Sequence, residues 1–371
     1  MPNQSSLTIA VPRETAPGEH RVALVPAEAG RLVKAGHKVR VERGAGTAAH
    51  FPDAAYEKAG AEVVAAAKDL LAAADVVLKV HPPTVAEAGM LREGSLLVSF
   101  LQVARDAAII EALRTRGVTA LSMDLVPRTS RAQAMDALSS QATVSGYHAV
   151  LLGARHMPRF LPMLTTAAGT IAPATVFVIG AGVAGLQAIA TARRLGANVR
   201  AFDIRPAVKE EVESLGATFV AAELLSQGAQ DAGGYAKEVT EETRKAEEGA
   251  IAKHVGESDL VITTAVVPGR KAPELVTEEM VRAMKPGSVI VDLAAESGGN
   301  CALTKPGEVV MAHGVTVVGP LNVPASMPTH ASQMYSRNLS SVLQYLLKDG
   351  ALTLDMGDEI VKAMRVTGGA A

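Results

Sequence analysis

The amino-acid sequence predicts an α/β protein with two doubly wound, parallel-sheet domains of the Rossmann-like type and a cleft between them. Short apolar runs alternate with helix-like stretches along the chain, which is the rhythm of βαβ units in a parallel sheet covered by helices. A second series of such runs begins after residue 174. The length of 371 residues is enough for two domains of ordinary size.

The first domain is predicted over residues 1–137. Its expected strands are the apolar runs at 7–14, 37–44, 75–80, 94–102 and 117–126. Between them lie helix-like stretches at 26–36, 53–61 and 106–117. Three of these residues are suited to end a helix because glycine tolerates a left-handed backbone: Gly36, Gly60 and Gly117.

The second domain is predicted over residues 138–327. Its expected strand-like stretches are 174–182, 198–203, 217–222, 259–267, 288–294 and 314–319, and a helix follows the first of them up to Leu195. A helical stretch at 134–156 is expected to bridge the two domains. The last long helix, roughly 325–347 by its apolar pattern, is expected to return residues 328–371 to the first domain.

Composition and charge exclude several classes of protein. The formal net charge is −2 and no block of like charge stands out, which argues against nucleic acid as a partner. The single cysteine, Cys301, allows no disulfide framework within the chain and suits a reducing compartment. The N-terminus lacks the basic and apolar regions of a signal peptide. None of the nine histidines has metal-ligand spacing with partners, so no metal is predicted.

An uncharged segment at 160–192 exceeds the length of a membrane-spanning helix. Pro173 and the glycine cluster at 180–185 divide it, however, and both residue types interrupt helices. The segment is therefore predicted to form a loop, a buried strand and the start of a helix, and no direct membrane span is expected.

The strongest functional motif is "VFVIGAGVAGLQAIATARRLGANVRAFDIR" at 176–205. Gly180, Gly182 and Gly185 form G-x-G-x-x-G directly after a predicted strand and before a predicted helix, which is the dinucleotide-binding arrangement. The first glycine permits the tight turn, the second lets the backbone approach a pyrophosphate, and the third lets the helix pack closely on the strand. The alternative is a glycine turn that binds no ligand.

Asp203 closes the next strand, 18 residues beyond Gly185. A carboxylate there can accept both ribose hydroxyls and repels a 2′-phosphate, so NAD is favoured over NADP. The nearby Arg205 leaves some room for a phosphate.

A second polar segment, "PRTSRAQAMDALSSQ" at 127–141, follows the predicted strand at 117–126. Ligands of open parallel sheets sit at the carboxyl ends of strands, and a nicotinamide needs donors and acceptors for its carboxamide and ribose. Arg128, Gln133, Asp136 and Ser139 supply such a set. The alternative is a solvated loop in which Asp136 and Ser139 are local caps.

Two further features leave their alternatives open. Gly233 and Gly234 precede Tyr235 and are suited to hinge a lid over a nucleotide, or else belong to a plain surface loop. Lys79, which ends a predicted strand, is suited to bind a carboxylate substrate or simply lies at the strand end.

Taken together, these motifs resemble the soluble NAD(H)-binding component of proton-translocating NAD(P) transhydrogenases. The resemblance covers essentially the whole chain and rests on the two segments quoted above and on "GGYAKE", "TTAVVPG", "MKPGSVIVDLAAESGGNC" and "NVP". It implies direct hydride transfer between NAD(H) on this chain and NADP(H) on a partner subunit, coupled to proton translocation by a membrane-spanning partner. It also implies a homodimer, a cytoplasmic location and peripheral attachment to the inner face of the cell membrane through partner subunits.

The resemblance also assigns roles to individual residues. It implies that Arg128, Asp136 and Ser139 hold the carboxamide and that Gln133 contacts the nicotinamide ribose and reaches towards the partner's NADP(H), so Gln133 and Asp136 are the expected catalytic positions. The other expected NAD(H)-binding residues are Gly180, Gly182, Val183, Ala184, Gly185, Asp203, Ile204, Arg205, Gly234, Tyr235, Ala265 and Val266.

Two alternative functions follow from the same residues. The fold is similar to that of alanine dehydrogenase, whose chemistry needs an acid/base group beside the reacting carbon. That enzyme uses a histidine and an aspartate where this chain has Gln102 and Glu296. The other alternative is a non-catalytic NAD(H)-sensing module, which would keep the glycine loop and Asp203 but would not need the polar segment at 127–141.

Overall fold

The chain divides into two compact units. The computed structural model describes residues 6–103, 106–220, 241–267, 270–348 and 351–368, and for 241–247 it describes the backbone only. The first unit comprises residues 1–141 and 324–371, and the second comprises residues 142–323. Helix α6 (Ala137–His156) runs across the division.

The first unit is built on a seven-stranded sheet in the order β18-β6-β5-β4-β1-β2-β3. All pairs are parallel except the edge pair of β18 and β6. The strands are β1 (Thr8–Val11), β2 (Lys38–Glu42), β3 (Glu62–Val64), β4 (Val76–Leu78), β5 (Leu96–Ser99), β6 (Thr119–Ser122) and β18 (Arg365–Thr367). A two-stranded pair, β16 (Leu347–Lys348) and β17 (Ala351–Leu352), follows the last long helix.

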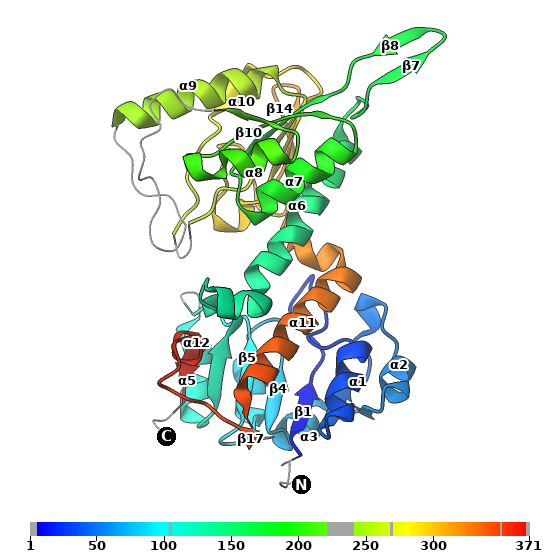
Figure 1. Cartoon of the computed structure of the whole chain (residues 1–371), viewed down its shortest axis with the longest axis vertical. Helices are drawn as coiled ribbons and strands as arrows, with labels where there is room; N and C mark the ends of the chain where they lie inside the picture. The colour runs from blue at the N-terminus through cyan, green and yellow to red at the C-terminus, as the bar shows by residue number, and fades with distance from the viewer. Residues whose placement is uncertain (1–5, 104–105, 221–240, 268–269, 349–350, 369–371) are drawn as a thin grey trace. The chain divides into compact units, whose positions relative to one another are not determined.

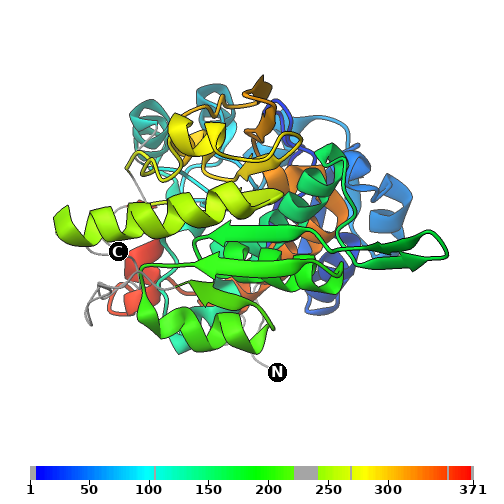
Figure 2. The same cartoon turned by 90° about the horizontal axis from the view of Figure 1, so that it is seen from above.

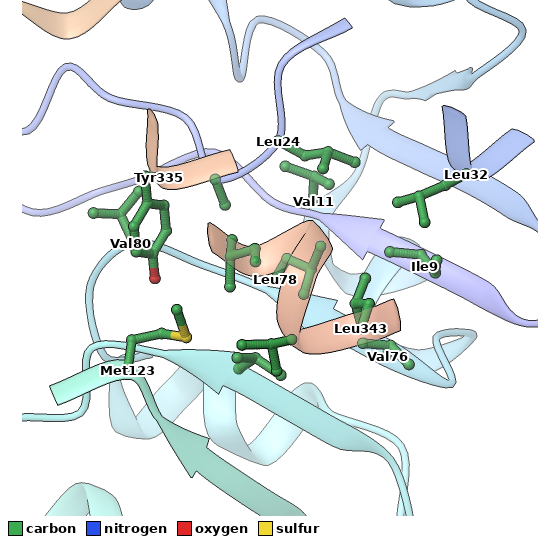
Figure 3. Packing of buried hydrophobic residues seen from close by; sticks show 14 of the residues in the cluster. Ile9, Val11, Leu24, Leu32, Val76, Leu78, Val80, Met123, Tyr335 and Leu343 are labelled. Carbon is green, nitrogen blue, oxygen red and sulfur yellow. The ribbon is translucent and has the colours of Figure 1, made fainter. Parts of the chain in front are cut away.

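Helices cover this first sheet. They are α1 (Pro26–Lys34), α2 (Asp53–Lys58), α3 (Ala67–Ala72), α4 (Val85–Met90), α5 (Ala107–Thr115), α11 (Pro328–Leu346) and α12 (Glu359–Met364). Helix α11 buries one apolar face against the sheet: Tyr335 and Leu343 pack in one cluster with Ile9 and Leu78 (Figure 3). The C-terminal residues from Pro324 onward thus complete the core of the first unit.

The second unit is built on another seven-stranded sheet, in the order β11-β10-β9-β12-β13-β15-β14. Only the edge pair of β14 and β15 is antiparallel. The strands are β9 (Thr175–Ile179), β10 (Asn198–Phe202), β11 (Thr218–Val220), β12 (Leu260–Thr263), β13 (Val289–Asp292), β14 (Val309–Ala312) and β15 (Val315–Val318). The order reverses between β9 and β12, and ligands of such sheets bind at this reversal.

Over its described residues, the second unit also has the α-helices α7 (Val183–Arg194), α8 (Lys209–Ser214), α9 (Glu241–Glu257) and α10 (Glu278–Arg282) besides α6. A hairpin of β7 (Leu164–Thr166) and β8 (Gly169–Ile171) extends away from the sheet of this unit (Figures 1 and 2). The hairpin lies in the segment predicted as a loop, so that part of the prediction was wrong. Its three-residue strands are largely exposed and therefore lack the apolar alternation of a half-buried strand.

The predicted fold class is confirmed: the chain has two mostly parallel, doubly wound sheets. Gly36, Gly60 and Gly117 follow helices with φ of +92°, +88° and +71°, the left-handed backbone that glycine tolerates. The antiparallel edge strands β14 and β18 were not predicted, because strand direction leaves no mark in a short apolar run.

Candidate functional site

The glycine-rich turn of the second unit lies where β9 ends and α7 begins. Gly180 has φ of +95°, and a Cβ there would lie 2.5 Å from Thr264 Oγ1. A Cβ at Gly185 would overlap the carbonyl oxygen of Gly180. Both positions therefore require glycine, one for the turn and one for the close packing of helix on strand.

Gly182 differs from its two neighbours in the motif. Its φ is −76°, and a Cβ built there would meet nothing within 4 Å. It is the N-cap residue of α7 and has no side chain to accept the first N–H groups of that helix. Open space in front of a helix N-terminus without a side-chain cap is the arrangement that binds an anion such as a phosphate.

A second glycine contact fixes the start of α7 from behind. Gly146 of α6 lies so close to Ala184 that a Cβ on Gly146 would overlap the Ala184 carbonyl oxygen. Val183, at the first turn of α7, is 41% exposed. The turn is thus held by backbone packing on its inner side and is open on its outer side.

Asp203, immediately after β10, is buried and fully hydrogen-bonded. Its Oδ2 accepts the Ala181 N–H at 2.7 Å and Arg205 Nη2 at 2.8 Å. Its Oδ1 accepts the Arg205 N–H at 2.9 Å and Arg205 Nε at 2.8 Å. The hydrogen bond to Asp203 raises the pKa of Arg205 above its ordinary value. Because a carboxylate has about four lone-pair sites, ribose hydroxyls reach Asp203 only if Arg205 yields some of its contacts.

The segment after β12 forms the opposite side of the strand-order reversal. Thr264 Oγ1 donates to the Gly180 carbonyl oxygen at 3.0 Å and thereby ties this segment to the glycine turn. Of the next two residues, Ala265 is half-buried and Val266 is 47% exposed. Two of the predicted binding residues therefore follow the carboxyl end of β12, in the segment that Thr264 ties to the glycine turn.

The polar segment at 127–141 belongs mainly to a 3₁₀ turn, η3 (Ser130–Met135), of the first unit. Arg131 Nη2 donates to Tyr345 Oη and to Asp358 Oδ2, both at 2.9 Å. Asn338 Nδ2 donates to the Ala134 carbonyl oxygen at 2.9 Å. Helices α11 and α12 thus fix the turn, and they do so through residues that no local sequence pattern connects with it.

The four residues predicted to contact nicotinamide lie on or beside this turn. Asp136 accepts the Ser139 N–H at 2.9 Å and the Ser139 hydroxyl at 2.6 Å, which is the local capping arrangement considered above as the alternative. Arg128 and Gln133 have exposed side chains. Their part in ligand binding stays a prediction.

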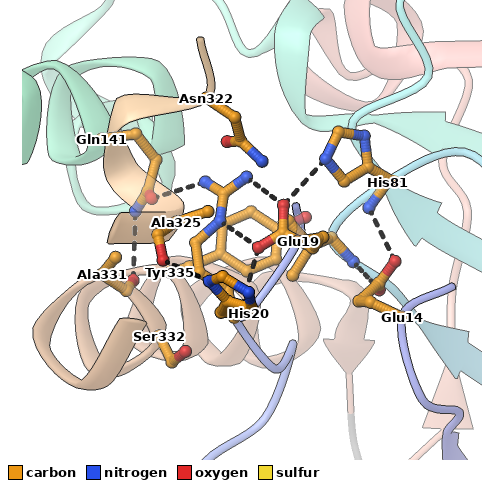
Figure 4. A network of polar contacts seen from close by, with 12 residues as sticks. Glu14, Glu19, His20, His81, Gln141, Asn322, Ala325, Ala331, Ser332 and Tyr335 are labelled. Carbon is orange, nitrogen blue, oxygen red and sulfur yellow. Dashed lines mark hydrogen bonds and ion pairs between the residues drawn. The ribbon is translucent and has the colours of Figure 1, made fainter. Parts of the chain in front are cut away.

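The carboxyl edge of the sheet in the first unit holds a buried group of charges (Figure 4). Arg21 donates from Nε and Nη2 to the two oxygens of Glu19 at 2.9 and 2.7 Å, and from Nη1 to Gln141 Oε1 at 2.7 Å. His81 Nε2 lies 2.8 Å from Glu19 Oε2. Burial alone would raise the pKa of Glu19, but the hydrogen bonds from Arg21 and His81 bring it below its ordinary value.

Lys79 completes this group. Its Nζ lies 3.5 Å from Glu14 Oε2 and 3.4 Å from Glu87 Oε1. Glu14 also accepts the backbone N–H groups of Val80 and His81. Burial raises the pKa of Glu14, although Lys79 opposes the shift. Each of the two buried cations therefore already has carboxylate partners from its own unit.

Other features considered in the sequence are the paired-glycine segment, the cysteine, metal binding and a membrane span. Gly234 and Tyr235 lie outside the described residues. Burial raises the pKa of the Cys301 thiol to about 11, which makes it a poor nucleophile. Among the residues that the structure describes, no group of three or more His, Cys, Asp or Glu side chains is arranged to hold a metal. Over the same residues, no helix combines the length and hydropathy that a membrane crossing requires.

Two buried residues beside the end of β12 were not among the predicted site residues. Asp292 ends β13 and accepts five hydrogen bonds, and Asn300 binds the backbone of Ala265. The signals in the sequence were the place of both residues in the motif "MKPGSVIVDLAAESGGNC" and the position of Asn300 after the paired glycines Gly298 and Gly299.

Comparisons with family models place both units in one family. Residues 10–145 match the alanine dehydrogenase/PNT N-terminal domain, and residues 149–370 match the alanine dehydrogenase/PNT C-terminal domain.

Individual relatives agree with these matches. The chain is 48% identical over 369 residues to the first part of the NAD(P) transhydrogenase alpha subunit of Rhodospirillum rubrum, covering 97% of this chain and 96% of that protein. The solved structure of a transhydrogenase from Sinorhizobium meliloti is similar with a TM-score of 0.89 and 45% identity, over 98% of this chain and 99% of that one. An L-alanine dehydrogenase structure is similar with a TM-score of 0.81 and 30% identity, over 97% and 94% of the two chains.

Proposed function

The chain belongs to the alanine dehydrogenase/PNT family and, within it, to the NAD(P) transhydrogenase alpha subunits, and we propose that its second unit binds NAD(H) for hydride exchange with NADP(H) on a separate subunit. The observation that carries the proposal is the environment of Gly182. Open space lies in front of the uncapped N-terminus of α7, between two glycines that cannot be replaced without overlap. This is the geometry that a pyrophosphate needs.

The residues around the turn have distinct parts in this proposal. The N–H groups at the start of α7, from Val183 and Ala184, bind the phosphates. Asp203 accepts ribose hydroxyls once Arg205 gives up some of its hydrogen bonds to that carboxylate. The negative charge of Asp203 disfavours the 2′-phosphate of NADP(H). Ile204, Ala265 and Val266 provide the remaining walls of the crevice.

The hydride step needs positioning rather than a protein base. When bound, the nicotinamide rings supply and accept the hydride, and their two C4 atoms must lie within about 3.5 Å of each other with water excluded. We propose that Arg128, Asp136 and Ser139 orient the carboxamide. Gln133 is then the residue that reaches towards the second nucleotide, since its exposed amide carries both a donor and an acceptor.

The residues at 102 and 296 favour transhydrogenation over alanine dehydrogenation. Oxidising an amino acid moves protons, and a side-chain amide such as Gln102 cannot act as an acid or base. The carboxylate of Glu296 is on the surface and accepts the Asn322 N–H. The buried cations Arg21 and Lys79 are paired with Glu19, Glu14 and Glu87, which leaves little positive charge for a substrate carboxylate.

The proposal also includes partners. An NADP(H)-binding subunit and a membrane-spanning subunit would complete the enzyme, hold this chain at the inner face of the cell membrane and couple hydride transfer to proton movement. We further propose that the chain acts as a homodimer. These partners are inferred from the transhydrogenase relative, which is itself only a portion of an alpha subunit.

Three measurements on one preparation test the proposal. Fluorescence titration should give tighter binding of NADH than of NADPH. Mixing with an NADP(H)-binding transhydrogenase component should give hydride exchange between NADH and NADP⁺, whereas an NAD(H)-sensing module would bind without exchange. Pyruvate, ammonium and NADH should give no alanine; a robust alanine dehydrogenase rate would contradict the proposal.

A further inference from the structure

A buried amide holds one wall of the proposed nucleotide crevice. Asn300 is completely buried. Its Oδ1 accepts the Ala265 N–H at 3.0 Å, and its Nδ2 donates to the Ala265 carbonyl oxygen at 2.8 Å. The same Nδ2 donates to the Pro273 carbonyl oxygen at 2.8 Å. One side chain therefore binds both backbone groups of Ala265, as a neighbouring strand would, and ties the end of β12 to a distant segment.

The chain before Asn300 is shaped to place this amide. Gly298 and Gly299 have φ of +102° and +81°, two consecutive left-handed residues that turn the chain back towards the sheet. A Cβ at Gly299 would lie 2.9 Å from the Thr304 Cβ and 3.0 Å from Asp292 Oδ2. The paired glycines are therefore needed for the turn that places Asn300.

Asp292 fixes the backbone on which the amide stands. Its Oδ2 accepts the N–H groups of Asn300 and Cys301 at 2.7 and 3.0 Å and the Thr304 hydroxyl at 2.6 Å. Its Oδ1 accepts the Thr263 hydroxyl at 2.8 Å and the Ala294 N–H at 3.0 Å. Because Thr263 is the last residue of β12, one fully buried carboxylate sets the register between that strand end and Asn300.

The Asn300 amide binds the backbone directly before Val266, an exposed residue of the proposed crevice. Val266 follows Ala265 directly and is 47% exposed, although it is an apolar residue at the carboxyl end of a central strand. Thr264, on the other side of Ala265, binds the glycine turn through its hydroxyl. The peptide groups of Ala265 thus connect the glycine turn to an exposed apolar side chain.

We propose that Asn300, supported by Asp292, is a positioning residue for the bound dinucleotide, because it fixes the Ala265–Val266 backbone as a rigid wall of the crevice beside the glycine turn. This inference rests on the proposed NAD(H) binding and adds a residue to it. Loosening the wall should weaken nucleotide binding even though Asn300 itself touches no ligand, since a flexible wall must be ordered again on binding.

The decisive variant is Asn300→Asp. It keeps Oδ1 for the Ala265 N–H but places a second oxygen against two carbonyl oxygens, so the NADH dissociation constant should rise about tenfold at pH 7.5, the effect of losing one or two hydrogen bonds. Protonation of the introduced carboxylate restores a donor, and burial favours that protonated form. NAD⁺ affinity of the variant, measured by calorimetry, should therefore recover towards wild type between about pH 7.5 and 5.5, while wild-type affinity stays flat.

Two controls separate positioning from stability. Asp259→Ala removes a buried carboxylate that accepts the Thr175 N–H where β9 and β12 begin, at the end of these strands away from the glycine turn. It should lower the melting temperature and leave NADH affinity unchanged. Thr304→Val removes the hydroxyl that donates to Asp292 Oδ2, so it loosens the support of Asn300 without changing a residue of the proposed crevice, and it should weaken NADH binding with only a small loss of melting temperature. It serves also if Asn300→Asp fails to fold.

The outcomes are distinct. If wild type does not bind NADH, the proposed function fails. If wild type binds but Asn300→Asp binds equally well, or shows no recovery on acidification, the positioning role is wrong. If Asn300→Asp is unfolded and Thr304→Val binds NADH like wild type, the role is also wrong.

Discussion

The two units share a sheet architecture but finish the carboxyl edges of their sheets in opposite ways. In the first unit, Glu14 and Asp124 accept backbone N–H groups from the ends of neighbouring strands, and Tyr335 of α11 donates to the Lys79 carbonyl oxygen. In the second unit, the strand ends are also tied together, but the edge opens at Gly182. The first edge is held by its own side chains, whereas the second leaves Gly182 facing open space, which is where we propose that the nucleotide binds.

The difference shows that a doubly wound sheet does not by itself make a nucleotide site. Both sheets place strand ends together, so both offer the position where ligands bind. At this edge the second unit begins a helix with a glycine that faces empty space, whereas the uncapped helices α1, α2 and α3 of the first unit begin after Val25, Pro52 and Ala66. The first unit uses its polar groups in internal ion pairs instead, such as Arg21 with Glu19.

The largest expected effect concerns the closed edge. Glu19→Gln removes the carboxylate that binds the buried Arg21 through both of its oxygens and should lower the free energy of unfolding by about 3–5 kcal/mol at pH 7. Because the folded-state pKa of Glu19 is below its ordinary value, this stabilisation is present above the unfolded pKa and is lost as the pH falls through the folded pKa. Urea unfolding of wild type and variant at pH 7 and at successively lower pH measures the loss of unfolding free energy and its dependence on pH.

Glu14→Gln is the matched control in the same edge. Burial raises the folded-state pKa of Glu14. The folded protein therefore loses stability as the pH rises from the unfolded to the folded pKa and Glu14 ionises. For this reason Glu14→Gln should lower the free energy of unfolding clearly less than Glu19→Gln. Equal losses for the two variants would show that the edge does not depend on the Arg21–Glu19 pair.

The next effect concerns the open edge. Gly182→Ala places a methyl group where nothing lies within 4 Å and where φ is an ordinary −76°, so the fold should lose about 1 kcal/mol or less. The same methyl group blocks the approach of the pyrophosphate, and the NADH dissociation constant should rise by about a hundredfold.

Gly249→Ala in α9 is its control, since that glycine also has open space around it and lies in a helix. It should leave NADH affinity unchanged and stabilise the helix slightly. Tight NADH binding by Gly182→Ala would remove the main support for the proposed function.

A smaller effect is expected at Asp203. Asp203→Ala should weaken NADH by about 1.5–3 kcal/mol, the range for a hydrogen bond to a charged group, and should narrow the preference for NADH over NADPH. Paired titrations with both nucleotides measure this. A wild-type protein that bound them equally would contradict the role given to Asp203.

The smallest effect concerns Gln133 in the first unit. Gln133→Asn keeps the amide but shortens its reach, so NADH affinity should stay within about threefold while hydride transfer slows at least about tenfold. Stopped-flow transfer between NADH and NADP⁺ in the reconstituted pair gives the rate. A transfer rate that fell only in proportion to NADH binding would make Gln133 an ordinary binding residue.

The sequence predicted those features that are local in the chain. Buried strands are short apolar runs, and the glycine turn is a contiguous motif, so the fold class and the candidate turn followed from pattern alone. The hairpin β7–β8 was missed because its strands are short and largely exposed.

Long-range side-chain pairing was beyond the sequence. Nothing in the local pattern indicates that Asp203 accepts the Ala181 N–H, 22 residues earlier, or that Asn300 binds the backbone of Ala265, 35 residues earlier. Such contacts depend on which strand ends meet at the sheet edge, and that is decided by tertiary packing.

The contrast between an open and a closed edge is tested most directly by hydrogen exchange with and without saturating NADH. We predict slower exchange over 180–186, 203–205 and 264–266 in the second unit, and unchanged exchange over 14–21 and 79–81 in the first. Protection of 14–21 and 79–81 with no change at the glycine turn would contradict the account.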